Sequence, residues 1–186
     1  MAKYNQKDDG IYLPVIPLRG MVIFPDTVNP ITVGRERSLE ALEYATTLDS
    51  AIFLVAQKDP TIEEPGEIDL YRVGTISKIV QIMRFPNDRM KVLLEGKERA
   101  EVIKYNFKKN IITSVVSPIK TKRAPNFTKI KAYYRKVWEL FKKYTNLTSS
   151  YPEEILQLID HNEDIDKIVN IISAQLLINF QKKQSF

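Results

Sequence analysis

The 186-residue sequence has no cysteine, one histidine and only six glycines. Without cysteine there is no disulfide, no thiolate nucleophile and no thiolate-bound metal, and a single histidine excludes a two-histidine zinc site. The phosphate-binding pattern G-x-x-x-x-G-K-[ST] is missing, because Gly96-Lys97 is followed by Glu98. Neither G-x-S-x-G nor H-E-x-x-H occurs. We therefore expect no catalytic residues, no metal ligands and no cofactor site in these residues.

Long apolar runs are also missing, since no segment approaches the roughly 20 residues that a membrane span needs. The first ten residues, MAKYNQKDDG, lack the apolar core of a signal peptide and are too acidic for a transit peptide. These features predict a cytoplasmic protein that does not engage a membrane.

Basic residues are in modest excess, with 28 Lys and Arg against 23 Asp and Glu, a net charge of +5. Residues 1–118 carry equal numbers of each sign, so the excess lies in residues 119–186. Such a patch attracts polyanions by counterion release, but charge runs also serve simply as solvated helix faces. The candidate polyanion contacts are Lys129, Lys131, Arg135, Lys136, Lys142 and Lys143.

Short apolar segments separated by turn residues dominate residues 1–118. The continuous run 51–56 is typical of a buried central strand, and 71–85 with 90–102 predicts a hairpin. Pro14 and Pro17 favour an edge or irregular strand over 11–18. We expect further short strands at 30–33 and 111–116, with Gly74 and Gly96 at bulges or bends.

One helix interrupts these strands, because apolar residues recur at spacings of three and four over 38–48. Ser38 is the expected N-cap of this helix. Six or so strands around one helix predict an α+β fold with a compact, partly closed β-barrel-like domain.

Beyond a basic linker at 119–127 the pattern turns helical over 128–186. A capping box at 150–153 predicts a short second helix, and a third helix is expected from about Asp164. We interpret the acidic cluster around His161 as an interhelical turn rather than a metal site. The helical extension is expected to be truncated at residue 186. The predicted apolar stripe of its first helix contains Ile130, Tyr133, Tyr134, Val137, Phe141 and Tyr144.

Apolar residues also stand where the chain is expected to turn, and exposed apolar loop tips are candidate contacts for protein partners. The alternative is that they fold back over the open end of the barrel. The charged triplet before the first helix is either a solvated cap or a further partner contact. The candidate contacts are Met21, Val22, Ile23 and Phe24 at the first turn, Met83, Phe85, Pro86 and Met90 at the hairpin, and Arg35, Glu36 and Arg37 before the helix.

Three sequence blocks carry a family resemblance: LPVIPLRGMVIFPDTVNPITVGRERSLEAL, FLVAQKD and DLYRVGTISKIVQIMRFPNDRMKVLLEGKERAEV. In this order and spacing, the sequence resembles the N-terminal domain of bacterial ATP-dependent Lon proteases over about residues 11–118. The resemblance implies a PUA-like β-rich substrate-recognition domain at 1–118, followed by a helical extension. It also implies a longer parent with an AAA+ ATPase module that uses ATP and Mg, and a Ser/Lys protease domain.

The resemblance implies a non-catalytic role for these residues. They would recognise unfolded, damaged or degron-bearing proteins, support a homohexamer and pass substrates to the ATPase. Two other functions stay open at this point. One is a nucleic-acid-binding module that uses the basic segment 120–143, and the other is a stand-alone adaptor of the LON-domain type.

Overall fold

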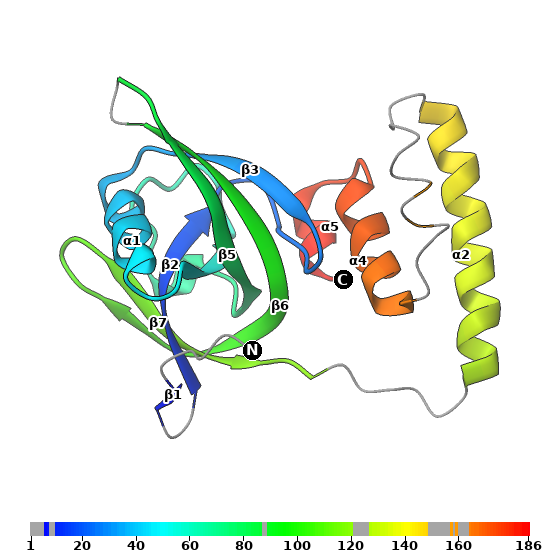
Figure 1. Ribbon diagram of the computed structural model, residues 1–186, viewed down its shortest axis with the longest axis horizontal. Helices are drawn as coiled ribbons and strands as arrows, with labels where there is room; N and C mark the ends of the chain where they lie inside the picture. The colour runs from blue at the N-terminus through cyan, green and yellow to red at the C-terminus, as the bar shows by residue number, and fades with distance from the viewer. Residues whose placement is uncertain are drawn as a thin grey trace.

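The computed structural model describes residues 6–7, 10–86, 89–120, 127–148, 157, 159 and 164–186. Strand-rich and helix-rich parts follow one another along the chain (Figure 1). The strands are β1 (Gln6–Lys7), β2 (Gly10–Leu18), β3 (Val28–Val33), β4 (Ala51–Ala56), β5 (Val73–Arg84), β6 (Met90–Phe107) and β7 (Ile112–Pro118). The helices are α1 (Glu36–Thr46), the 3-10 turn η1 (Glu67–Asp69), α2 (Phe127–Thr148), α4 (Ile165–Gln175) and α5 (Phe180–Gln184).

Five strands close into a ring, in the order β2, β4, β5, β6 and β7, with β7 pairing back onto β2. The 18-residue strand β6 makes closure possible, because its first half pairs with β3 and its second half with β7, while β5 lies along its other edge. The expectation of an α+β fold with a partly closed barrel is therefore confirmed.

The strand over residues 11–18 is irregular rather than an edge strand, so the second of the two predicted alternatives is the one the structure has. Residues Ile11–Pro14 of β2 pair antiparallel with β7, and Val15–Leu18 pair parallel with β4. The two prolines are tolerated because residues 12–18 are paired along only one edge at a time, so a missing N–H need not interrupt a ladder.

Two apolar cores fill the strand-rich part, and β4 separates them. Ile52 and Leu54 belong to the core that α1 covers, whereas Phe53 and Val55 point into the other. Successive side chains of a strand point to opposite faces, so a strand buried on both faces has a continuous apolar sequence. All six residues of β4 are buried, as the run 51–56 predicts.

Gly96 marks a bulge where the hairpin bends. Ile76 pairs with Glu98 and Ser77 with Gly96, which leaves Lys97 as the extra residue. A Cβ at Gly96 would collide with the carbonyl of Phe24, because the loop after β2 crosses there. Gly96 accepts a hydrogen bond from the N–H of Asp26 and donates one to the carbonyl of Thr27, both 2.9 Å. The expected bulge is confirmed at this glycine.

The N-cap of helix α1 is Arg35, three residues before the expected Ser38. Ser38 is instead buried in the first turn, and Arg35 makes no capping hydrogen bond with its side chain. Helix α4 begins as predicted, because the carboxylate of Asp164 accepts hydrogen bonds from the N–H groups of Asp166 and Lys167. The second helix, expected near 150–159, falls outside the described residues except for Gln157 and Ile159.

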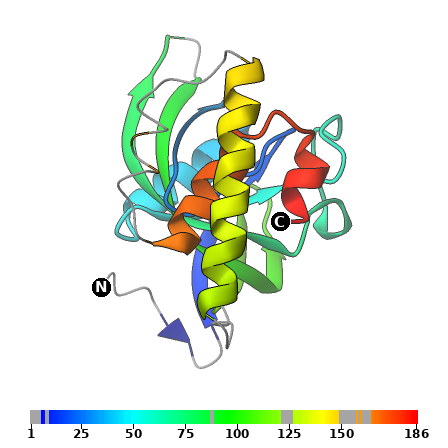
Figure 2. The ribbon, with the colours of Figure 1, turned by 90° about the vertical axis from the view of Figure 1, so that its right-hand side faces the viewer.

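A third core joins α2 to α4, which lies between α2 and the strands (Figure 2). From α2 it takes Phe141, with Tyr134, Trp138 and Tyr144 packed against it. The predicted stripe is wrong at Tyr133 and Val137, which are 63% and 41% exposed. The buried stripe lies one residue further along, since Tyr134, Trp138 and Phe141 follow each other at spacings of four and three.

Candidate functional site

The tip of the β5–β6 hairpin carries exposed apolar side chains. Met83 is 41% and Phe85 48% exposed, and Pro86 is also exposed. The Phe85 N–H donates to the Arg89 carbonyl at 2.9 Å, which fixes the base of the turn. Met90 differs, because it is 8% exposed and belongs to the core beneath α1. The prediction of an exposed contact is therefore corrected for Met90.

The loop after β2 is turned inward at its second half. Met21 and Val22 are half-buried, but Ile23 and Phe24 are each only 2% exposed. The Thr75 hydroxyl donates to the Ile23 carbonyl at 2.6 Å. The expectation of exposed contacts is corrected for Ile23 and Phe24: here the chain does fold back over the barrel end.

Two neighbouring grooves run from this loop to the hairpin tip. The arginine groove, about 550 Å³, lies between the end of β2 and strand β3, and contains Met21, Ile31 and the arginines Arg19, Arg35 and Arg89. Among the residues that the structure describes, no acidic side chain lines it. The hairpin groove, about 430 Å³, lies between α1 and the hairpin. Gly34 and Arg89 line both grooves, so the two adjoin.

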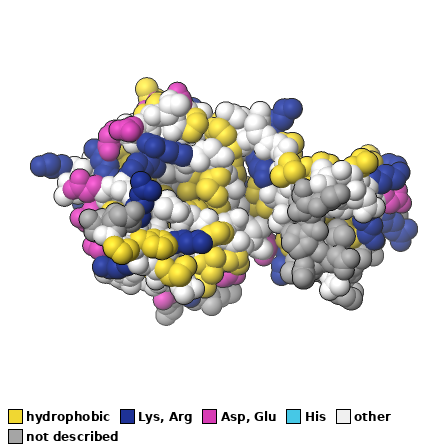
Figure 3. Space-filling view, turned by 90° about the horizontal axis from the view of Figure 1, so that it is seen from above, with side chains coloured by type: hydrophobic (Ala, Val, Ile, Leu, Met, Phe, Trp, Pro, Cys, Tyr) yellow, Lys and Arg dark blue, Asp and Glu magenta, His cyan; other side chains and the backbone are white. Residues whose placement is uncertain are grey.

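The hairpin groove has a different charge from its neighbour. Glu36, Glu40 and Glu43 of α1 face Phe85 and Arg84 across it. Arg84 forms an ion pair with Glu43 at 3.7 Å. Seen from above, hydrophobic side chains alternate with charged ones over the strand-rich part of the molecule (Figure 3). The two adjoining grooves can thus contact an extended segment of mixed apolar and charged sequence.

Arg35 has a structural role that the sequence pattern did not indicate. Its guanidinium donates to the Pro17 carbonyl, to Gln57 Oε1 at 2.7 Å and to the Glu63 carbonyl at 3.3 Å. Burial, together with the charge of Arg19, lowers the pKa of Arg35 from its ordinary value. Arg35 therefore ties the end of β2 to the loop after β4 and forms the floor of the arginine groove.

The two residues after Arg35 have separate surroundings. Arg37 forms an ion pair with Glu64 at 3.1 Å and donates from Nε to the Lys109 carbonyl at 3.2 Å. Glu36 is exposed in the first turn of α1, where its charge favours the positive end of the helix dipole. The structure thus brings Glu36 to the hairpin groove and uses Arg37 to hold two loops together.

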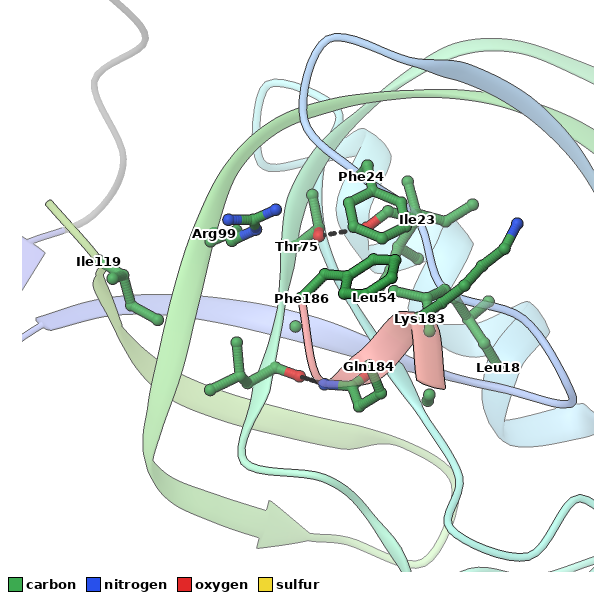
Figure 4. Close-up of a pocket in the computed structure, with 14 residues that line it drawn as sticks. Leu18, Ile23, Phe24, Leu54, Thr75, Arg99, Ile119, Lys183, Gln184 and Phe186 are labelled. Atoms are coloured by element: carbon green, nitrogen blue, oxygen red, sulfur yellow. Dashed lines mark hydrogen bonds between the residues drawn. The ribbon is translucent and has the colours of Figure 1, made fainter. Parts of the chain in front are cut away.

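A third cavity, about 290 Å³, opens at the barrel end between the strands and α5 (Figure 4). Leu18, Phe24 and Leu54 line its strand side, and Gln184 and Phe186 line the other. Gln184 Nε2 donates to the Val73 carbonyl at 2.9 Å. No sequence signal marks this site, because the five-residue α5 is too short for a recognisable period.

The basic residues expected to contact polyanions lie on α2. Arg135, Lys136, Lys142 and Lys143 are exposed, whereas the side chains of Lys129 and Lys131 lie outside the described residues. Lys136 pairs with Glu139 at 3.9 Å, and Lys142 Nζ lies 4.6 Å from the centre of the Trp138 ring. The aromatics Tyr134 and Phe141 pack inward, so they do not form a stacking platform beside these charges.

Within the described residues, no three His, Asp or Glu side chains come close enough together to hold a metal ion. His161 and its acidic neighbours Asp160 and Glu163 lie outside that part of the chain. None of the helices in the described part is both long and apolar enough to cross a membrane.

A ring of strands with a covering helix, followed by helices that pack on each other, defines an α+β fold with a partly closed barrel and a helical extension. A family model described as the ATP-dependent protease La (LON) substrate-binding domain matches residues 12–186. The chain belongs to this family, which confirms the resemblance seen in the sequence blocks.

Named relatives agree with this assignment. The chain is 39% identical over 173 residues to a Lon protease of Clostridium acetobutylicum, and 35% identical over 185 residues to one of Haemophilus influenzae. These matches cover 93% and 100% of this chain but only 22% of each relative. The chain thus spans about a fifth of the length of the relatives it matches.

Among solved structures, the N-terminal domain of a Mycobacterium avium complex Lon protease has the same fold. The TM-score is 0.74 at 19% sequence identity, covering 93% of this chain and 88% of that one. At this identity the similarity extends to the fold and not to individual site residues.

Proposed function

We propose that this chain captures exposed apolar segments of unfolded, damaged or degron-bearing proteins at its hairpin tip and the two adjoining grooves. The observation that supports this function best is the exposure of Met83, Phe85 and Pro86 next to two adjoining grooves, one lined by arginines and one by both glutamates and arginines. Exposed apolar side chains beside a groove are typical of protein-binding surfaces.

The contact residues in this proposal are fewer than the sequence suggested. The hairpin tip supplies Met83 and Phe85. Met21 lines the arginine groove, and Val22 lines the barrel-end cavity. Methionine adapts to many partner shapes, which suits capture of varied sequences. Binding at one such surface is weak, because only a few side chains are buried on each contact.

In the full-length protein we propose that the captured segment passes to an ATPase module that uses ATP and Mg, and then to a serine protease domain. Assembly of the parent into a homohexamer would place several weak surfaces around one entrance. Several linked sites raise the effective concentration of a bound chain and so increase its residence time. We place this activity in the cytoplasm.

The experiment compares Phe85→Glu and Met83→Glu with the unchanged full-length protease. A charge in place of an apolar contact should lower degradation of an unfolded protein about tenfold or more, because one apolar side chain contributes ~1.5–3 kcal/mol when it is fully buried. Cleavage of a short fluorogenic peptide and basal ATP hydrolysis should not change, because neither needs capture of an unfolded chain.

The matched control is Ile68→Glu. Ile68 is an apolar residue of the strand-rich part that is 81% exposed, and it lines none of the three cavities described above. If Ile68→Glu slows degradation as much as Phe85→Glu does, or if Phe85→Glu leaves it unchanged, the hairpin tip is not the capture site.

A further inference from the structure

Helix α2 has a second apolar face, of which only Tyr144 also contacts the core between α2 and α4. We define it as the outer seam: Tyr133, Val137, Leu140, Tyr144 and Leu147. Along it, Val137 is 41%, Leu140 53% and Leu147 85% exposed. Tyr144 contacts the helical core at the edge of this seam. The inner face of the helix is made by other residues, Tyr134, Trp138, Phe141 and Thr145.

The spacing of the outer seam is that of a coiled coil. Successive members are four, three, four and three residues apart, which corresponds to the alternating a and d positions of a heptad. Two exposed leucines and a valine in this register over three turns expose an apolar strip that water solvates poorly. The outer-seam residues Tyr133, Val137, Leu140 and Tyr144 each come one position before an inner-face residue, and one position is about 100° around a helix. The outer seam therefore lies beside the contact with α4 rather than beneath it.

The charges beside the outer seam restrict what can bind there. In this heptad, Lys136 and Lys143 occupy the two g positions, seven residues apart, and both are exposed. The opposite flank, the e positions, holds Tyr134 and Phe141, which pack toward α4. Residues at e and g select the partner helix of a coiled coil by charge.

A second copy of this chain fits poorly. In an antiparallel pair, g positions face each other, so Lys136 and Lys143 would meet the same two lysines. In a parallel pair, g faces e of the other helix, and here the e residues are already packed against α4. Like charges held together at an interface lower its stability.

We propose that the outer seam binds an acidic amphipathic helix, with aliphatic residues at its own seam and Glu or Asp facing Lys136 and Lys143. The aliphatic residues would cover Val137, Leu140 and Leu147. Attraction between the two lysines and the partner's carboxylates would favour an acidic over a basic partner. It would also make the binding affinity fall as the salt concentration rises.

The test uses two synthetic peptides of about three heptads, each with Leu at the a and d positions. One has Glu at its flanking positions and the other has Lys. Calorimetric titration of this chain should show binding of the Glu peptide and not of the Lys peptide. Leu140→Glu should weaken binding of the Glu peptide roughly tenfold or more, because it puts a like charge into the apolar strip. Ile68→Glu, on the strand-rich part, should leave it unchanged.

A charge-reversed variant guards against general effects on folding. With Lys136→Glu and Lys143→Glu together, the preference should invert, so that the Lys peptide binds and the Glu peptide does not. Equal binding of both peptides to the unchanged chain would overturn the proposal, as would binding of the Glu peptide that Leu140→Glu leaves intact. Concentration-dependent dimerisation that Leu140→Glu abolishes would show that a second copy occupies the seam, and would overturn it as well.

Discussion

Arg99 on β6 donates a hydrogen bond to Asn170 on α4, with 3.0 Å between Nη2 and Oδ1. Asn170 in turn donates to Asp26, at 3.4 Å, so one amide connects α4 to two segments of the strand-rich part. The Arg99 guanidinium also lies 5.7 Å from the centre of the Phe24 ring. Burial lowers the pKa of Arg99 from its ordinary value, although nearby Asp166 acts in the opposite direction.

This bridge predicts that Asn170→Ala loosens the helical part from the barrel without unfolding either. Loss of two partly buried hydrogen bonds should cost about 1–3 kcal/mol at the contact. Small-angle scattering should show a larger radius of gyration, with circular dichroism unchanged. Val169→Ala is the control, because Val169 is the exposed neighbour of Asn170 and its side chain forms no hydrogen bond. This variant should give the same scattering curve as the unchanged chain. An unchanged radius in Asn170→Ala would contradict the prediction.

The close approach at the β6 bulge makes Gly96 sensitive to substitution. A Cβ there would collide with the backbone carbonyl of Phe24, so Gly96→Ala should destabilise the chain by about 1–3 kcal/mol or more in urea unfolding. Gly66→Ala is the control, because its nearest neighbour would be Asp69 Oδ2 at an ordinary 3.6 Å. It should be neutral or slightly stabilising. Equal destabilisation by the two variants would contradict this account of Gly96.

Because of Tyr105, the folded state should lose stability at alkaline pH. Its hydroxyl donates to the Tyr71 carbonyl at 2.9 Å, and burial is the main cause that raises its pKa well above the ordinary 10.0. The folded state then keeps a proton that the unfolded state loses, so stability is full below pH 10.0 and falls as pH rises above it. Tyr105→Phe should be less stable by about 1 kcal/mol at pH 7 and should lose less on going to pH 11. Parallel pH profiles for the two proteins would rule out this assignment.

Much of the architecture could be predicted from the sequence because local patterns determine it. The run at 51–56, the hairpin and the start of α4 each follow from residues close together in the chain. The errors arose where distant segments decide the outcome. Nothing local shows that β2 changes partner at Val15, or that Phe24 folds under the loop while Phe85, also apolar and beside a proline, stays outside.

The site was predictable in part for the same reason. An apolar turn indicates a contact surface, but its exposure depends on which other segments cross it in three dimensions. The contacts predicted from the sequence therefore included the buried Ile23, Phe24 and Met90 as well as the exposed Met83 and Phe85. The charged triplet Arg35-Glu36-Arg37 shows the same limit of prediction from sequence. A guanidinium cannot be recognised as structural until its acceptors, which come from residues 17, 57 and 63, are in place.

Arg35 should therefore matter more for folding than Arg37. Arg35→Met keeps the aliphatic stem but leaves the Gln57 and Pro17 oxygens without their donor, and should cost about 2–3 kcal/mol in unfolding free energy. Arg37→Met removes a surface ion pair and one exposed hydrogen bond to the Lys109 carbonyl, and should cost about 1 kcal/mol or less. Equal losses in urea unfolding would mean that Arg35 does not hold the floor of the groove.

The most direct test of the central claim is photocrosslinking from the hairpin tip. A photoreactive benzoylphenylalanine would replace Phe85 in the full-length protein, and in a second sample Ile68, and each would be irradiated with a permanently unfolded protein. We predict crosslinks from position 85 that a folded form of the same protein does not give, and few from position 68. Equal yields from the two positions, or none from position 85, would contradict capture at the hairpin tip.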